Sequence, residues 1–235
     1  MSEYPDFITP EQYDQYTAAW AALIDSGDAT ALEQAFEAPG GARLNFLNFS
    51  LDQVVALVTA PGVRSIKARF LLMPSPASGS RFSVALFAAD TPAKDTSEPL
   101  TPYYIPTPAP ATTTQTVEPA PGPSTQLPRA EAVRWLSDWA NTMPQDFTTG
   151  IFTTDSGPLQ GGNFEVSTFQ DPLAMAPPYT NKTLFLNLSL IQDPEPTADL
   201  VVYIGALGSR TQGSIEGLPT GDDYYDGMQA CPPNH

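Results

Sequence analysis

The sequence predicts an α+β fold in which two small domains of the same design follow one another. Three observations lead to this prediction: a β-hairpin pattern that occurs twice, capped amphipathic helices before the hairpins, and one proline-rich stretch between the two halves. We expect domains at residues 1–105 and 129–226, a linker at 106–128 and a C-terminal tail at 227–235. Each domain is predicted to pack its helices on one face of a short antiparallel sheet.

The repeated hairpin is the strongest signal. Residues 64–88 and 183–206 both alternate apolar and polar side chains around a turn rich in proline, which places the apolar residues on one face of each strand. The two copies superpose without a gap at a shift of 118 (184 − 66 = 118), and this even shift keeps the same face inward. The matched pairs are Ile66 with Leu184, Ala68 with Leu186, Phe70 with Leu188, Leu72 with Leu190, Phe82 with Leu200, Val84 with Val202 and Leu86 with Ile204.

The first domain begins with helices that are marked by their caps. Thr9 followed by Pro10 and Gln12 predicts a helix start with a capping box, and Gly27 ends this helix. Asp28 caps a short second helix. The buried face of the first helix is predicted to contain Tyr13, Tyr16, Trp20, Leu23 and Ile24.

A strand and a third helix lead into the first hairpin. Residues 42–49 read as a strand, and Ser50 with Gln53 forms a second capping box, whose helix ends at Pro61-Gly62. An extended piece at 99–105 closes the first domain.

The second domain is predicted to repeat this order. Trp135 and Trp139 answer Tyr16 and Trp20 at a shift of 119, on a helical face that also holds Ala132, Leu136 and Met143. Phe164, Val166 and Phe169 answer Leu44, Phe46 and Phe49 at a shift of 120. Asp171-Pro172 is predicted to cap a shorter third helix that Pro177-Pro178 cuts off, and residues 221–225 answer 101–104.

Charge and composition exclude several classes of function. The chain has 26 acidic and 10 basic residues, a net charge of −16, which disfavours binding to nucleic acid or anionic lipid. We see no export leader and no apolar run long enough to span a bilayer, and the single Cys231 fits a reducing compartment, so we expect a soluble cytoplasmic protein.

Residues for catalysis or cofactor binding are scarce. The one histidine is His235 at the end of the chain, and no phosphate-binding glycine motif is present. Cys231 and His235 are too few to hold zinc, so we expect no cofactor and no metal. Asp222, Asp223 and Asp226 form an acidic cluster that reads as a solvated loop, with carboxylate catalysis as the alternative. Cys231 lies in a tail, where it either has no role or cross-links two chains.

One surface has an unusual composition. Arg64, Lys67, Arg69 and Arg81 belong to the first hairpin, and the last three share its odd-numbered face. In the second hairpin this face contains Phe185, Asn187, Ile191, Asp199, Val201 and Tyr203. The cationic face either protects a sheet edge or is complementary to the apolar and acidic face of the second hairpin.

These observations favour a non-enzymatic structural or interaction protein that self-associates through its two unlike sheet faces, with itself or another protein as partner. The alternative is a binding module for a peptide or small ligand between the two repeats, with Phe185, Tyr203, Tyr224 and Tyr225 as contacts. A third, less favoured hypothesis is an enzyme that uses Asp222 and Asp223.

The chain also resembles a group of uncharacterised small proteins from Bacteroidota. Phe49-Ser50-Leu51, the helix that ends at Pro61-Gly62, the following hairpin and Cys231-Pro232-Pro233 carry the resemblance. It covers residues 42–90 best, repeats weakly at 163–208, and departs at 90–95 from the turn typical of the group. It implies a bacterial protein with a capped helix followed by a hairpin, and it implies no activity or site residue.

Overall fold

The computed structural model describes residues 6–38, 40–76, 79–91, 98–107, 126–192, 195–206, 212, 224–225 and 229–230. The helices are α1 (Pro10–Ser26), α2 (Ala29–Ala35), α3 (Leu51–Val58), α4 (Arg129–Asn141) and α5 (Ser167–Met175), with the 3-10 helices η1 (Pro144–Asp146) and η2 (Thr149–Phe152). The strands are β1 (Phe7–Ile8), β2 (Phe46–Ser50), β3 (Ser65–Ser75), β4 (Gly79–Ala89), β5 (Tyr103–Tyr104), β6 (Gln126–Leu127), β7 (Thr153–Thr154), β8 (Gly157–Pro158), β9 (Gly161–Glu165), β10 (Lys182–Ile191), β11 (Thr197–Ala206), β12 (Tyr224–Tyr225) and β13 (Gln229–Ala230).

Local chemistry produces the predicted helix starts and confirms the α+β class. Thr9 Oγ1 accepts a hydrogen bond from Gln12 N (3.3 Å) while Gln12 Oε1 accepts one from Thr9 N (3.0 Å). Ser50 and Gln53 form the same reciprocal pair at 3.2 and 2.9 Å, at the start of α3. Gly27 ends α1 in the left-handed conformation at φ 69°.

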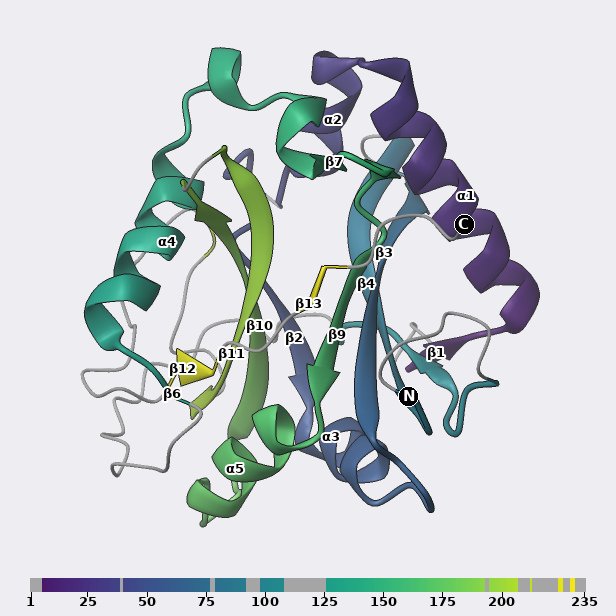
Figure 1. Ribbon diagram of the computed structural model, residues 1–235, viewed down its shortest axis with the longest axis vertical. Helices are drawn as coiled ribbons and strands as arrows, with labels where there is room; N and C mark the ends of the chain where they lie inside the picture. The colour runs from purple at the N-terminus through teal and green to yellow at the C-terminus, as the bar shows by residue number, and fades with distance from the viewer. Residues whose placement is uncertain are drawn as a thin grey trace.

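Two antiparallel sheets face each other in the centre of the molecule (Figure 1). One sheet has the order β1-β5-β4-β3-β9-β13 and the other has the order β2-β10-β11-β12-β6. Helix α1 covers the outer face of the first sheet and α4 covers that of the second, so that the layers run helix, sheet, sheet, helix (Figure 1). Helices α3 and α5 lie at one end of this sandwich, and α2 lies at the other (Figure 1).

The two predicted domains exchange a strand. Strand β2, from the first half of the chain, pairs with β10 of the second half, with Phe49 opposite Leu184. Strand β9, from the second half, pairs with β3 of the first, with Phe164 opposite Ile66. Each sheet is therefore built from a hairpin of one half and a neighbouring strand of the other.

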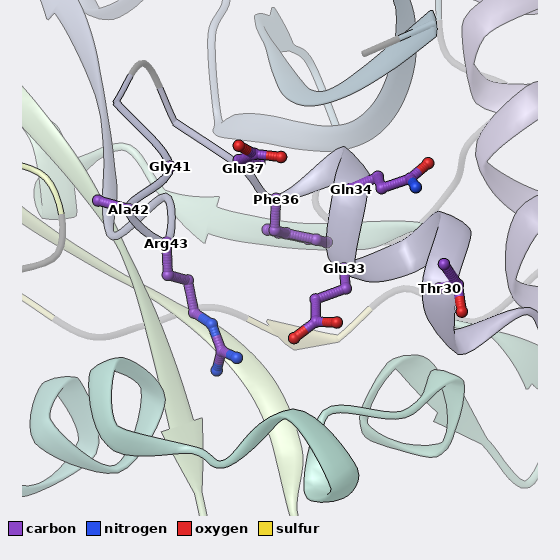
Figure 2. A pocket seen from close by; sticks show the side chains of 8 residues that line it. All are labelled: Thr30, Glu33, Gln34, Phe36, Glu37, Gly41, Ala42 and Arg43. Atoms are coloured by element: carbon purple, nitrogen blue, oxygen red, sulfur yellow. The ribbon is translucent and has the colours of Figure 1, made fainter.

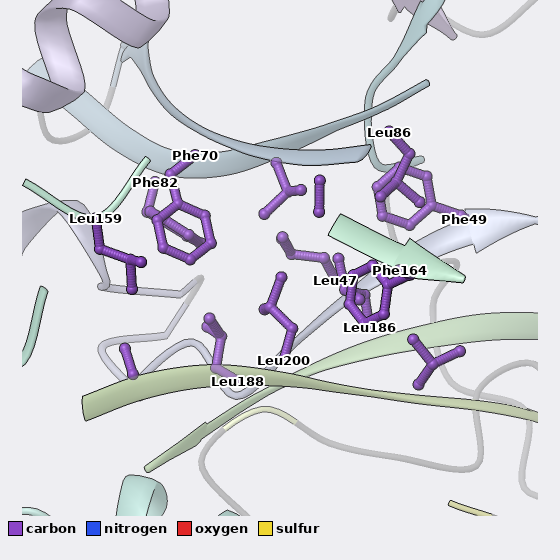
Figure 3. Packing of buried hydrophobic residues seen from close by; sticks show 14 of the residues in the cluster. Leu47, Phe49, Phe70, Phe82, Leu86, Leu159, Phe164, Leu186, Leu188 and Leu200 are labelled. Atoms are coloured by element: carbon purple, nitrogen blue, oxygen red, sulfur yellow. The ribbon is translucent and has the colours of Figure 1, made fainter. Parts of the chain in front are cut away.

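The two halves share one hydrophobic core, so the prediction of two separately packed domains is wrong. Phe70 and Phe82 of one sheet and Leu186, Leu188 and Leu200 of the other point into the same space (Figure 3). The inward face of each hairpin is thus buried by the other hairpin, which is why neither half closes a core alone.

A cluster of aromatic rings crosses the junction of the halves. Phe36 stacks on Phe82 with 4.3 Å between ring centroids and on Phe152 of the other half at 5.3 Å. Trp20 and Trp139 are both fully buried in the same cluster. These contacts tie the two halves together at the end of the sandwich that holds α2.

Several backbone contacts recur in the two halves at a nearly constant residue shift. Trp20 Nε1 donates to Leu159 O at 2.8 Å, and Trp139 Nε1 donates to Leu44 O at 2.9 Å (139 − 20 = 119; 159 − 44 = 115). The same pattern holds for Leu44 N to Phe36 O and Leu159 N to Phe152 O, and for Phe70 N to Gln160 O and Leu188 N to Asn45 O. The first and third of these pairs of bonds join one half to the backbone of the other, and the second pair lies within each half.

The residue matching from the sequence needs two corrections. Ile66 pairs with Ala88 but Leu184 pairs with Ile204, so the shift is 118 on the first strand of the hairpin and 116 on the second (204 − 88 = 116). This two-residue difference at the turn keeps the inward face because it is even. Phe49 and Phe164 occupy matching places at a shift of 115 (164 − 49 = 115) rather than the predicted 120, since Phe49 lies opposite Leu184 and Phe164 lies opposite Ile66.

Two further details of the second half differ from the prediction. Helix α5 begins at Ser167 and contains Pro172 as its sixth residue, so Asp171-Pro172 does not cap it. Met143 lies beyond the end of α4 and is 59% exposed, because the helix stops at Asn141.

Candidate functional site

The cationic face of the first hairpin is covered by helix α1 and is not an open interface. Lys67 and Arg69 are 1% and 3% exposed, whereas Arg64 and Arg81 are exposed. Tyr13 of α1 packs on this face and stacks on Tyr103 with 4.1 Å between ring centroids. The expectation that Lys67 and Arg69 form an accessible surface is therefore wrong, because a helix from the same half covers them.

Arg69 has a structural task inside this layer. Its Nη1 donates to the carbonyl oxygens of Ala68 (3.0 Å) and Gly162 (2.9 Å), and its Nη2 donates to Asn163 Oδ1 (3.0 Å). The long side chain fits because Gly161 lies opposite Arg69 on the neighbouring strand. Arg69 thus holds the exchanged strand β9 against β3.

The matching face of the second hairpin is buried as well. Phe185, Asp199 and Tyr203 are 1%, 6% and 3% exposed, and Phe185 and Tyr203 pack in one cluster with Trp135 and other side chains of α4. Phe185 stacks on Tyr203 at 4.9 Å, so these rings contact each other rather than a partner. The expectation that they form an accessible binding face is wrong for the same reason as in the first hairpin.

Asn187 takes the place in the second sheet that Arg69 has in the first (187 − 69 = 118). Its Nδ2 donates to Phe185 O (3.2 Å) and Val201 O (3.0 Å). Phe46 lies opposite Asn187, where the first sheet has Gly161 opposite Arg69. In the first sheet the large residue, Arg69, is on the hairpin and the small one, Gly161, is on the exchanged strand. In the second sheet the large residue, Phe46, is on the exchanged strand and the smaller Asn187 is on the hairpin.

The remaining predicted residues are placed only in part. Tyr224 and Tyr225 form β12, which pairs with β11 at Val202, as β5 pairs with β4 at Leu86. Cys231, Asp222 and Asp223 lie outside the described residues, as do most of the predicted linker and tail.

Two sheet edges near the junction are occupied by the chain itself. Gln212 accepts from Asn45 N (2.7 Å) and donates to Phe46 O (2.9 Å), while Thr107 N donates to Asn48 O (2.9 Å). These bonds satisfy the outer side of β2. Strand β13 pairs with the outer side of β9 in the other sheet.

A pocket of about 370 Å³ lies beside helix α2, and Arg43 in its lining contacts Phe147 of the second half. We call it the junction pocket. Its principal lining residues are Thr30, Glu33, Gln34 and Phe36 from α2 and its end, and Glu37 and Arg43 from the loop that leads to β2. Phe36 belongs both to the lining of the pocket and to the aromatic cluster, where it contacts Trp139 and Phe147.

Arg43 is the central polar residue of this pocket. Its Cζ lies 4.2 Å from the centroid of the Phe147 ring, a cation–π contact with the other half of the chain, and Nη1 donates to Trp139 O at a long 3.4 Å. The backbone holds it there, because Arg43 and Glu37 form a β-bridge and Leu44 N donates to Phe36 O (2.8 Å). The guanidinium is therefore preorganised by contacts from both halves.

Burial and a neighbouring carboxylate have opposite effects on the pKa of Arg43. Burial lowers the pKa of the Arg43 guanidinium, and the Glu33 carboxylate partly opposes this shift. Among the described residues, Arg43 forms no ion pair with a carboxylate at hydrogen-bonding distance. Figure 2 shows Arg43 and Glu33 extending in the same direction, from the loop and from α2, while Glu37 points away from them. Most of the five N–H donors of the guanidinium thus remain available to a bound group.

A second pocket, of about 580 Å³, lies between the end of α4, η1 and the turn of the second hairpin. Asp138, Asn141, Gln145, Asp146 and Gln192 contribute polar groups to it. None of the described residues that line it is basic, so it lacks a preorganised charged donor.

In the described part of the chain, no three side chains of His, Cys, Asp or Glu come close enough together to bind a metal ion. No described helix combines the length and the apolar character that crossing a membrane requires.

Sequence reasoning missed Arg43. The residue falls at the start of a predicted strand, and nothing in its local pattern distinguishes it from a solvent-facing arginine. The only available signal is its position after Gly40 and Gly41, both at positive φ (93° and 80°), which let the loop turn back on α2. Its aromatic partner lies 104 residues away in the chain (147 − 43 = 104).

Comparison with models of protein families, with curated proteins and with solved structures gives no match for this chain. The functional interpretation therefore rests on the geometry described above.

Proposed function

We propose that this chain is a non-enzymatic binding module whose ligand site is the junction pocket, which is lined by residues 30–43 of the first half. The observation that carries this proposal is the guanidinium of Arg43, which lies over the ring of Phe147 of the other half and also lines the pocket. A cation held in a partly buried, preformed position is the kind of group that orients a bound ligand.

The chemistry of the pocket favours recognition over catalysis. Its lining contains neither histidine nor cysteine, and Arg43 itself does not transfer protons near neutral pH. The buried polar groups Arg69 and Asn187 bind backbone carbonyl groups and so belong to the scaffold. What the pocket offers is a charged donor, two nearby carboxylates and an apolar floor.

We also propose that the chain is a fused pair of related halves that exchange a strand. The recurring indole-to-backbone bonds of Trp20 and Trp139 support this, as does the equal arrangement β1-β5-β4-β3-β9 and β6-β12-β11-β10-β2 of the two sheets. In this arrangement Arg43 of the junction pocket contacts Phe147 of the other half.

Self-association through the two sheet faces is not part of this proposal. Lys67, Arg69, Phe185 and Tyr203 are already buried within the chain, and the outer side of β2 is bonded to Gln212 and Thr107. The net charge of −16 disfavours nucleic acid and anionic membranes as partners. A small ligand or a short peptide is the partner that this geometry favours.

A ligand screen on the full-length protein tests the proposal. Thermal unfolding is recorded with a panel of small charged and neutral molecules, because a ligand that binds only the folded state raises the midpoint. We expect at least one compound to stabilise the native protein and to lose this effect in Arg43→Gln. Arg134→Gln is the matched control, since Arg134 is exposed, does not line the pocket and forms an ion pair with Glu131 at 3.8 Å. A panel without any Arg43-dependent stabilisation contradicts the proposal.

The oligomeric state is measured in parallel, with and without reductant. Light scattering at low salt is expected to give a monomer mass in both conditions. Large, salt-sensitive species would instead favour the assembly that the sequence pattern suggested, and a dimer that reductant dissolves would assign a cross-link to Cys231.

A further inference from the structure

The chemical class of ligand for the junction pocket follows from the charges on its wall. Arg43 presents a planar guanidinium, which matches the two oxygens of a carboxylate in a bidentate contact. The Glu33 carboxylate extends in the same direction, as Figure 2 shows, and among the described residues it forms no ion pair with Arg43. The pocket therefore holds a guanidinium and the Glu33 carboxylate without an ion pair between them, while its second carboxylate, Glu37, points away from both.

This pairing discriminates between kinds of ligand. A simple anion would meet Glu33, Glu37 and the overall charge of −16, all of which oppose it. A simple cation would meet the guanidinium of Arg43. A molecule that carries a carboxylate and an ammonium group on neighbouring atoms can place the carboxylate against Arg43 and the ammonium group toward Glu33, so each group faces its opposite charge.

We infer that the junction pocket binds a free α-amino acid, with its carboxylate on Arg43 and its ammonium group facing Glu33. This inference rests on the proposed function and specifies its ligand class. The volume of about 370 Å³ fits this size, since it lies near the lower end of the roughly 300–1,000 Å³ that small-molecule sites occupy. Phe36 supplies an apolar wall for the side chain of the ligand.

Isothermal titration of the full-length protein with each of the twenty common amino acids, at low ionic strength, tests the inference. We expect saturable binding of at least one of them. Its N-acetyl derivative, which lacks the ammonium charge, and its amide, which lacks the carboxylate, are each expected to bind about tenfold to hundredfold more weakly, the loss usual for one charge-assisted contact. A peptide that ends in lysine presents the same two charges from another source and serves as a separate arm.

Two variants assign the contacts. Glu33→Gln removes the charge of an exposed side chain at nearly constant size and is expected to weaken binding of the zwitterion, while binding of the N-acetyl derivative is unchanged or improved. Arg43→Lys keeps the positive charge but removes the paired N–H donors of the guanidinium. It is expected to weaken binding of the free amino acid and of its N-acetyl derivative to a similar extent. Thermal unfolding verifies that both variants fold, and Arg134→Gln is expected to bind like the native protein.

The outcomes separate the two proposals. If none of the twenty amino acids binds, or if the N-acetyl acid binds as tightly as the free amino acid, the zwitterion inference is overturned. The proposed function still stands if another compound binds in an Arg43-dependent manner. Binding only of the lysine-terminated peptide overturns the free amino acid as ligand and assigns the pocket to peptide ends.

Discussion

Replacing Gly161 by alanine tests the strand exchange directly. Gly161 lies in β9 at φ +123°, and a Cβ there would sit 2.2 Å from Ala68 O and 3.0 Å from Arg69 Cα on strand β3. The unfavourable backbone conformation costs about 1–3 kcal/mol. Pushing the exchanged strand away from β3 adds about 1–3 kcal/mol, as for other overpacked sites. We expect the free energy of unfolding of Gly161→Ala to fall by about 2–6 kcal/mol, a large share of the ~5–15 kcal/mol typical of a domain.

Gly27→Ala is the matched control. Gly27 also has a positive φ, 69°, but a Cβ there would meet no atom within 4 Å. This variant is expected to lose only about 1 kcal/mol, the cost of the left-handed conformation alone. Both are measured by denaturant unfolding followed by tryptophan fluorescence. Equal losses in the two variants would refute the close approach of β9 to β3, and separate transitions for the two halves would refute the shared core.

Three further predictions follow from the same contacts. Cutting a protease site inserted within residues 108–125 is expected to leave one particle in size-exclusion chromatography, because β2 pairs with β10 and β9 with β3; elution of two smaller species would contradict the exchange. Phe36→Ala, in the aromatic cluster, is expected to lower the free energy of unfolding by about 3–5 kcal/mol in urea, while Phe7→Ala, at a 52% exposed position, changes it by less than about 0.5 kcal/mol. Burial, and to a lesser degree Asp14, raises the pKa of Tyr103 above its ordinary 10.0, so the folded protein holds this proton more tightly than the unfolded chain. Stability is then expected to fall as the pH rises above 10.0, with a smaller fall in Tyr103→Phe; identical pH profiles of unfolding in the two proteins would contradict this.

Local chemistry made the helices and hairpins predictable. The caps at Thr9 and Ser50 depend on residues three positions apart, and the two-residue period of the hairpins depends on neighbours along one strand. The same period identified the inward face of each hairpin, which is buried as expected. Such features need no contact with distant parts of the chain.

The outward face of the hairpins was misjudged because its burial depends on other elements. Charged residues are rarely buried without partners, so Lys67 and Arg69 suggested an exposed surface. Arg69 is nevertheless buried, because Gly161 leaves room for it and carbonyl groups of two strands accept its hydrogen bonds. Gly161 and Gly162 lie in the other half of the chain, so the sequence around residue 69 does not reveal them.

The sequence alone determined which segments form helices and hairpins and which side of each hairpin faces inward, because these depend on neighbouring residues. Only the tertiary structure decided that β2 and β9 cross to the opposite sheets, that one core serves both halves, and that Arg43 rests on Phe147. The physical reason is that strand pairing and aromatic packing are settled by competition among surfaces distant in the chain, which a local pattern does not record.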